Sequence, residues 1–229
     1  MSKTLLNSII ILTLVANQAY SLVYRSINNH GLHLLRQIYD SEKGKNNIFF
    51  SPLSIASTLS MVFHGSIGQT REELASILTY DQKTDTQLKK EWNSILDSLD
   101  DTDKPYKLLT ANGLFIQDKF EVQQSYQDIL LSIYKAKCES KDFSDPTTTA
   151  DINKWISRST NGKIENFFNS LNPNTVMLLI NAVYFKGQWL RPFEKSDTKS
   201  EPFKNFGEQK VMVPIMKTEV RLLSHKIYF

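Results

Sequence analysis

Apolar side chains recur at helical spacing in several separate segments of the chain. Near the N-terminus, the spacing of Ile27, Leu34 and Ile38 predicts an amphipathic helix. Two more helices are predicted over residues 122–133 and 152–162, and Gly162 ends the second of them. The strongest pattern lies in the middle of the chain, where the apolar stripe consists of Leu88, Trp92, Ile95, Leu96 and Leu99.

Capping signals divide residues 51–78 into two predicted helices. Ser51 can accept a hydrogen bond from the free amides of a first turn, and Pro52 suits the first helical position. Gly65 and Gly68 are expected to end this helix. A Thr-x-x-Glu capping box at residues 70–73 predicts that the next helix begins there. Its expected buried residues are Leu74, Ile77 and Leu78.

Apolar runs predict strands at residues 48–50, 108–116 and 176–185, and a turn is expected at residues 145–146. The last run is almost continuously apolar, which is typical of a strand buried on both faces. Asn181 interrupts it, and a buried amide without a hydrogen bond costs about 1–3 kcal/mol. Asn181 is therefore expected to have a polar partner on another element. Because helices and strands are mixed without regular alternation, the pattern favours an α+β fold.

The composition is that of a globular protein and excludes some classes of function. The 229 residues are 41% hydrophobic and 22% charged, and the formal net charge of +3 is spread along the chain. No block of like charge suggests a nucleic-acid partner. Cys138 is the only cysteine, so the chain has no internal disulfide and Cys138 is expected on a half-buried strand.

The first 21 residues have the pattern of a secretory signal peptide. Lys3 precedes a mostly apolar stretch over residues 5–16, which is too short to span a bilayer. Ala19 and Ser21 supply the small residues that a signal peptidase requires. We therefore predict cleavage after Ser21, a mature domain of 208 residues (229 − 21) over 22–229, and an extracellular location. A buried N-terminal helix is the alternative.

Three stretches, in this order and spacing, resemble the serpin family of serine protease inhibitors. They are NIFFSPLSI at residues 47–55, TNGKI at residues 160–164 and NAVYFKGQW at residues 181–189. The resemblance implies an α+β fold with many helices and three sheets. It also implies a suicide inhibitor of serine proteases, sometimes of cysteine proteases, rather than an enzyme. In that family a cleaved reactive loop inserts as a strand into the main sheet.

The family's reactive loop follows a run of small residues after an acidic pair, and no such run occurs in this sequence. We therefore expect the chain to be the N-terminal, C-terminally truncated portion of the serpin fold. Without the loop it should not inhibit by itself. It should also expose strand edges and apolar surface.

The resemblance also implies roles for particular residues in conformational control. Ser51, Ser54 and Asn181 match the family's "shutter", where the strands of the main sheet part. Trp189 matches the "breach", where the loop first enters. The helix that covers the sheet is matched by Trp155, Thr160 and Gly162. Plainer roles stay open: Ser51 as a helix cap, Asn181 as a structural hydrogen-bonding group, and both tryptophans as core anchors.

Other functions have little support in the sequence. Four histidines are present, yet none lies in a recognisable motif and no G-x-S-x-G elbow occurs, so catalysis is not expected. His30 and His33 can share a helix face, but two ligands are too few for zinc, and no metal or other cofactor is expected.

Three further expectations concern partners and origin. Heparin is an unexpected partner because the helix over residues 88–99 carries only Lys89 and Lys90 against Glu91 and Asp97. A non-inhibitory secreted carrier or chaperone is the main alternative function. A truncated splice or pseudogene product is a further one.

Overall fold

A computed structural model describes residues 21–43, 46–80, 84–99, 106–189, 191–205 and 209–218. The described residues form two compact units, one ending at Lys186 and the other beginning at Gly187. Of the predicted signal peptide, only Ser21 lies among the described residues. None of the helices in the described part is long and apolar enough to cross a membrane.

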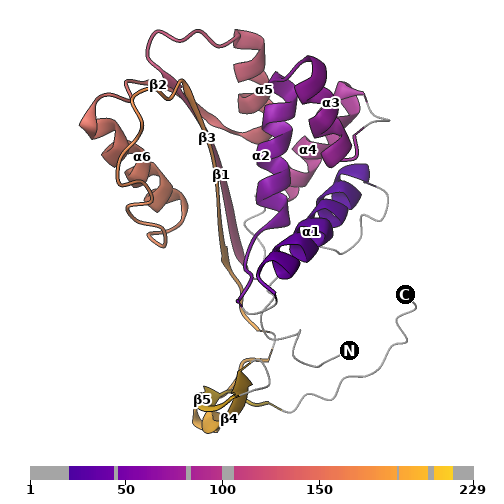
Figure 1. Cartoon of the computed structure of the whole chain (residues 1–229), viewed down its shortest axis with the longest axis vertical. Coiled ribbons are helices and arrows are strands. Elements are labelled where there is room, and N and C mark those ends of the chain that lie inside the picture. The colour runs from indigo at the N-terminus through magenta and orange to yellow at the C-terminus, as the bar shows by residue number, and fades with distance from the viewer. Residues whose placement is uncertain are drawn as a thin grey trace. The chain divides into compact units, whose positions relative to one another are not determined.

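The first unit contains six described helices and a three-stranded sheet (Figure 1). The helices are α1 (Leu22–Ser41), α2 (Pro52–Gly65), α3 (Gly68–Ile77), α4 (Asp85–Leu99), α5 (Gln124–Tyr134) and α6 (Pro146–Ser159). The strands are β1 (Lys107–Gln117), β2 (Lys137–Lys141) and β3 (Met177–Lys186). This mixture of helices and sheet agrees with the predicted α+β class.

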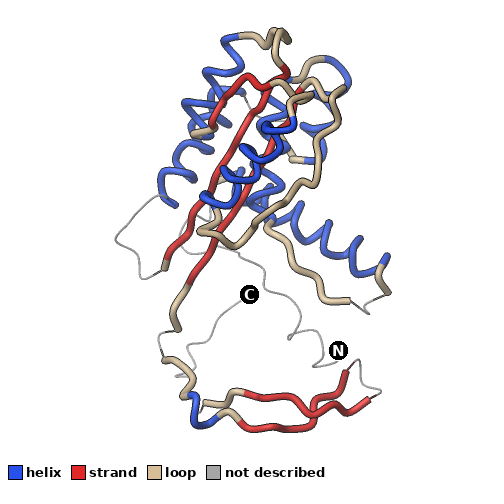
Figure 2. The backbone as a smooth tube through the Cα atoms, turned by 90° about the vertical axis from the view of Figure 1, so that its left-hand side faces the viewer, coloured by secondary structure: helices blue, strands red, loops and turns tan. Residues whose placement is uncertain are grey.

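The sheet has the strand order β2-β1-β3, with β1 parallel to β2 and antiparallel to β3. Figure 2 shows the long strands β1 and β3 side by side. Figure 1 shows α6 on one face of the sheet and α2 to α5 on the other. Side chains of β1 alternate between these faces: Leu114 and Ile116 join the larger core, whereas Phe115 joins the core beneath α6.

The larger core is built around the apolar stripe of α4. All five residues predicted for that stripe are buried, and Trp92 is fully buried. The indole of Trp92 donates to the Tyr80 hydroxyl at 2.9 Å, and that hydroxyl lies 2.8 Å from the Ser60 hydroxyl. Burial raises the pKa of Tyr80 to about 12, so this buried cluster stays uncharged.

The predicted start of α3 is wrong. This helix begins at Gly68 and not at the Thr-x-x-Glu box, and its N-cap makes no side-chain hydrogen bond. Thr70 therefore lies in the first turn of the helix and not at its N-cap, and the Glu73 carboxylate accepts from the Gln69 side chain at 2.7 Å. Gly68 therefore starts a helix and does not end α2. Leu74 and Leu78 are buried as predicted, but Ile77 is 49% exposed.

Two other local predictions are also wrong. Residues 145–146 start α6 and do not form a turn, because the Asp145 carboxylate accepts from the Thr147 amide at 2.8 Å and Pro146 is the first helical residue. This is the same combination of cap and proline that starts α2. Residues 48–50 form no strand, and only Ile48 makes an isolated bridge.

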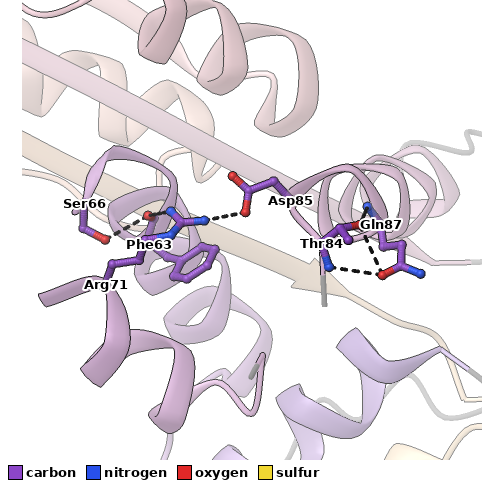
Figure 3. A network of polar contacts seen from close by, with 6 residues as sticks. All are labelled: Phe63, Ser66, Arg71, Thr84, Asp85 and Gln87. Atoms are coloured by element: carbon purple, nitrogen blue, oxygen red, sulfur yellow. Dashed lines mark hydrogen bonds and ion pairs between the residues drawn. The ribbon is translucent and has the colours of Figure 1, made fainter. Parts of the chain in front are cut away.

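Arg71 connects three helices of the first unit (Figure 3). Its guanidinium donates to the Phe63 carbonyl at the end of α2 at 2.8 Å and stacks 3.9 Å from the centre of the Phe63 ring. The same guanidinium pairs with Asp85 at the start of α4. Thr84 and Gln87 cap the start of α4 beside this pair. One side chain of α3 therefore joins the ends of α2 and α4.

The second unit is a small antiparallel pair, β4 (Lys199–Asn205) and β5 (Gln209–Ile215), preceded by the short helix η2 (Lys195–Asp197). Phe203 pairs with Val211 near the middle of the two strands. Val211 and Met212 are exposed, so this pair has a small apolar surface of its own.

Candidate functional site

Two asparagines face each other at the centre of the sheet. Asn112 of β1 and Asn181 of β3 are register partners in the antiparallel pair. The Asn181 amide nitrogen donates to the Asn112 side-chain oxygen at 2.7 Å. This confirms the prediction that Asn181 has a polar partner on another element. Both strands place these side chains on the face that carries Leu114 and Val183, which belong to the larger core.

Asn112 also binds the end of a helix. Its amide nitrogen donates at 2.7 Å to the Tyr134 carbonyl, at the last residue of α5. The last carbonyls of a helix have no partner within the helix, so Asn112 satisfies one of them. Tyr134 is itself buried, and this burial raises its pKa well above the ordinary value. Asn112 therefore connects β3, β1 and α5 through one buried amide.

The side-chain oxygen of Asn181 is buried and has no hydrogen-bond partner among the described residues. Its amide group is therefore half satisfied: the nitrogen binds Asn112 and the oxygen binds nothing described. A buried polar atom in this state costs about 1–3 kcal/mol. Such an atom at the centre of the sheet is unusual and calls for an explanation.

Ser51 acts as the N-cap of α2. Its hydroxyl accepts from the Ser54 amide at 3.2 Å, and Pro52 begins the helix, as the cap pattern predicts. α2 packs against β3, which brings this part of the chain to the same face as Asn181. Neither serine side chain is hydrogen-bonded to Asn181 in the described structure. A shutter role for Ser51 and Ser54 stays a prediction.

Trp155 of α6 lies on the opposite face of the sheet. It packs edge to face against Phe115 with ring centroids 5.4 Å apart. Gly113 lets the indole approach, because a Cβ there would lie only 2.8 Å from the Trp155 ring. The end of α6 is fixed by Thr160, whose hydroxyl donates to the Ile156 carbonyl at 2.9 Å. Gly162 follows with a φ of +72°, which favours glycine.

Trp189, the predicted breach residue, belongs to the second unit. It is 72% exposed and contacts Phe193 edge to face, with centroids 5.9 Å apart. Within this unit Trp189 is therefore not a buried core residue, which was the alternative interpretation. Its predicted role at the entry to the sheet stays a prediction.

The sequence analysis missed Asn112 and Tyr134 as members of the site. The signal for Asn112 was present, because an Asn-Gly pair inside an apolar strand is as unusual as Asn181 itself. The partner of the Asn112 amide is a backbone carbonyl, and nothing in the sequence marks it. The site is thus a hydrogen-bonded contact between strands and a helix.

The described site joins two strands and a helix through hydrogen-bonded amides. In the described part of the chain, no group of three or more His, Cys, Asp or Glu residues is placed to hold a metal ion. Cys138 lies half-buried on β2 as predicted, and burial raises the pKa of its thiol. A raised thiol pKa disfavours the reactive thiolate.

Comparisons with known proteins show which family the chain is similar to. A model of the family described as Serpin (serine protease inhibitor) matches residues 25–227. Iripin-2 of Ixodes ricinus is 34% identical over 225 residues, covering 96% of this chain and 56% of Iripin-2. The structure of emu ovalbumin has a TM-score of 0.77 at 28% identity, covering 85% of this chain and 54% of that chain. Reactive-loop-cleaved human thyroxine binding globulin also has a TM-score of 0.77, at 30% identity, covering 86% of this chain and 60% of that chain.

The chain belongs to the serpin family. The family model extends across both compact units, and the fold is that of the serpin structures. The chain spans about half the length of the curated relatives it matches. The family is one of protease inhibitors and not of enzymes.

Proposed function

We propose that this chain is part of a serine-type endopeptidase inhibitor that acts by reactive-loop cleavage and strand insertion. Its partner is a serine protease, or in some members of the family a cysteine protease, that cleaves an exposed loop as a substrate. The cleaved loop then adds to the main sheet and supplies new main-chain hydrogen bonds. In this chain, β3 would be the strand that accepts the loop.

The sheet topology supports this role for β3. β1 occupies the centre of the described sheet and pairs with β3 along ten consecutive positions of β3. That pairing uses one edge of β3, and the other edge has no strand partner among the described residues. The unpaired amide and carbonyl groups of an edge strand are a template for another extended segment.

The unpartnered oxygen of Asn181 is the observation that carries the proposal. It belongs to a residue halfway along β3, on the face of the sheet that carries the larger core. A donor on a strand or loop beyond β3 would satisfy it. A polar group kept at a cost to stability is expected where function, and not packing, selects the residue. Ser51, Ser54 and Trp189 are proposed to support the same movement.

A synthetic strand tests this role directly. We expect a peptide of about 13 residues with alternating small side chains to pair with β3 and to slow hydrogen exchange of the amides over residues 177–186. At 100 times its Kd, such a peptide should stabilise the chain by about 2.7 kcal/mol, measured by thermal unfolding. A matched peptide with N-methylated alternate amides cannot form the ladder and should have no effect. Equal protection by both peptides, or by neither, would count against strand addition.

Inhibition is tested separately with trypsin and chymotrypsin. The 229-residue chain alone is expected to give no covalent complex on a denaturing gel, because its sequence contains no hinge of small residues for a reactive loop. A longer product of the same gene that carries the loop should give such a complex. A covalent complex with the 229-residue chain would overturn the first expectation. Its absence with a loop-carrying product would overturn the inhibitory function.

A non-inhibitory carrier is the second candidate. It is favoured by the similarity to human thyroxine binding globulin, whose name states a bound ligand. A carrier should bind a small molecule without forming a covalent complex with a protease. The loop-carrying product therefore distinguishes the two functions by the presence or absence of that complex.

Secretion after cleavage behind Ser21 is also proposed. The Ser21 hydroxyl donates to the Glu91 carboxylate at 2.8 Å, and the Val23 amide donates to the same oxygen at 2.9 Å. Cleavage would remove the hydroxyl but leave a positive α-amino group on Leu22, next to Val23. An ion pair between that α-amino group and Glu91 would then offset the loss of the Ser21 hydroxyl, which also caps α1 by accepting from the Tyr24 amide.

The N-terminus of the secreted product checks this proposal. Protein sequencing of material from the culture medium should begin at Leu22. The variant Ser21→Arg places a large charged residue at the cleavage position and should block processing there. A secreted product that begins at Met1 would contradict the signal peptide.

A further inference from the structure

A cavity of about 250 Å³ lies between α6 and β2, and charged side chains surround it. β2 contributes Lys137, Glu139 and Lys141, and α6 contributes Asp151, Lys154 and Arg158. Four cations and two carboxylates therefore face one space. The aromatic residues Phe115 and Trp155 also line it.

Both carboxylates that line the cavity form ion pairs with lysines of β2. Lys137 pairs with Glu139 at 2.7 Å, and Lys141 lies 3.0 Å from Asp151 and 3.7 Å from Glu139. Lys154 and Arg158 pair with no carboxylate among the described residues. The cavity therefore has an excess of two positive charges, and both belong to α6.

Lys154 and Arg158 are four residues apart, so they are neighbours on one face of the helix. Two like charges at this spacing repel each other and destabilise an isolated helix by about 0.2–0.5 kcal/mol. Both side chains border the cavity, where an anion could contact them together. Such a ligand would remove the repulsion.

Structural roles explain only some of these charges. Lysines on β2 protect an edge strand from pairing with other chains, which accounts for Lys137 and Lys141. A cation in the last turn of a helix interacts favourably with the helix dipole, which accounts for Arg158. Neither reason applies to Lys154, which lies in the second half of α6 but before its last turn.

We propose that this cavity binds a sulfate or phosphate ester of a small molecule such as a sugar. An arginine guanidinium matches the oxygens of sulfate and phosphate with two parallel hydrogen bonds, and a lysine adds a point charge. The half-buried indole of Trp155 gives an apolar surface against which the ring of the ligand can pack. This site is independent of the proposed inhibitory function.

The test uses glucose 6-phosphate, glucose 6-sulfate and glucose with the 229-residue chain. Either ester should shift the nuclear magnetic resonance signal of the Trp155 indole N–H, whereas glucose should not. The buried indole of Trp92 belongs to the other core and is an internal reference. A shift with one ester alone identifies the anion, and shifts with both identify the shared charge. No shift with either ester, or an equal shift with glucose, overturns the proposal.

Charge variants then locate the binding site. Lys154→Gln and Arg158→Gln should each weaken ester binding by about fivefold, which is the upper end for an exposed ion pair. Lys163→Gln makes the same change just beyond α6 at an exposed lysine outside the cavity, and it should bind as the wild type does. Asp151→Asn removes a competing carboxylate and should bind at least as tightly. Equal weakening in Lys163→Gln, or weaker binding in Asp151→Asn, would refute the site.

Discussion

Asn112→Leu is expected to lower the free energy of unfolding by about 2–6 kcal/mol, because it leaves two buried polar groups without partners at about 1–3 kcal/mol each. The groups are the Tyr134 carbonyl and the Asn181 amide nitrogen, both 2.7 Å from Asn112. Asn112 is only 4% exposed, so water cannot replace the lost bonds. Denaturant unfolding of the 229-residue chain, compared with the wild type, measures this change.

The double variant separates the hydrogen bonds from simple packing. Asn181→Leu removes both the nitrogen that Asn112 accepts from and the oxygen that has no partner. When both partners are replaced by apolar groups, the cost is much smaller than when one is left alone. The pair Asn112→Leu with Asn181→Leu should therefore be more stable than the sum of the two single changes predicts. Strict additivity would mean that the two asparagines are not coupled.

This cycle also bears on why Asn181 is present. If its oxygen is an uncompensated cost in the 229-residue chain, Asn181→Leu alone should cost less than Asn112→Leu. Asn112 supports the fold of the described unit through two bonds, whereas Asn181 makes one bond and leaves one atom unsatisfied. The residue would then be explained by a partner outside the described residues, such as a side chain on a strand added beside β3, and not by the stability of this sheet.

Sequence patterns predicted the elements well where the cause was local. The stripe of α4, the cap and proline at the start of α2, and the long strands β1 and β3 all follow from spacing and capping. At α3 the helix begins at Gly68, so Thr70 lies within the first turn and Glu73 accepts from Gln69 and not from a cap amide. Side chains compete for partners, and a motif does not reveal which competitor wins.

The site was harder to predict because its contacts are distant in the sequence. Asn181 could be marked as an unpaired polar residue in a buried strand, but its partner lies 69 residues earlier. Only the register of β1 against β3 places the two amides opposite each other. The charged cavity has the same origin: β2 and α6 each contribute three charged side chains with a small net positive charge, and the larger excess arises only where the two elements meet. Local sequence patterns predict helices and strands, whereas the contacts that build a site depend on how distant segments pair in the fold.

His64, at the end of α2, has a pKa that is set by how its side chain packs in the folded chain. Both of its ring nitrogens are buried and have no hydrogen-bond partner among the described residues. Its ring lies against Phe63 and Tyr134, with centroids 5.4 Å and 6.0 Å away. Burial lowers the pKa of His64 from 6.5 to about 4, with Asp85 opposing this shift and Lys89 and Arg71 adding to it.

We therefore expect acid to destabilise the chain through His64. The folded state holds the ring neutral, whereas the unfolded chain takes up a proton once the pH falls below about 6.5. This contribution to stability is fully present above pH 6.5 and is lost as the pH falls toward 4. The loss at pH 4 amounts to about 3 kcal/mol. Free energies of unfolding measured at pH 7 and pH 5 in the wild type and in His64→Phe give this contribution by difference.

The variant His64→Phe keeps an aromatic ring between Phe63 and Tyr134 but cannot take up a proton. Its stability should fall less than that of the wild type between pH 7 and pH 5, because only the remaining titrating groups respond. The matched change His33→Gln alters an exposed histidine of α1 and should leave the wild-type difference in place. If His64→Phe and the wild type lose the same stability over this range, the ring is not held neutral by burial, and the acid sensitivity must come from other titrating groups of the chain.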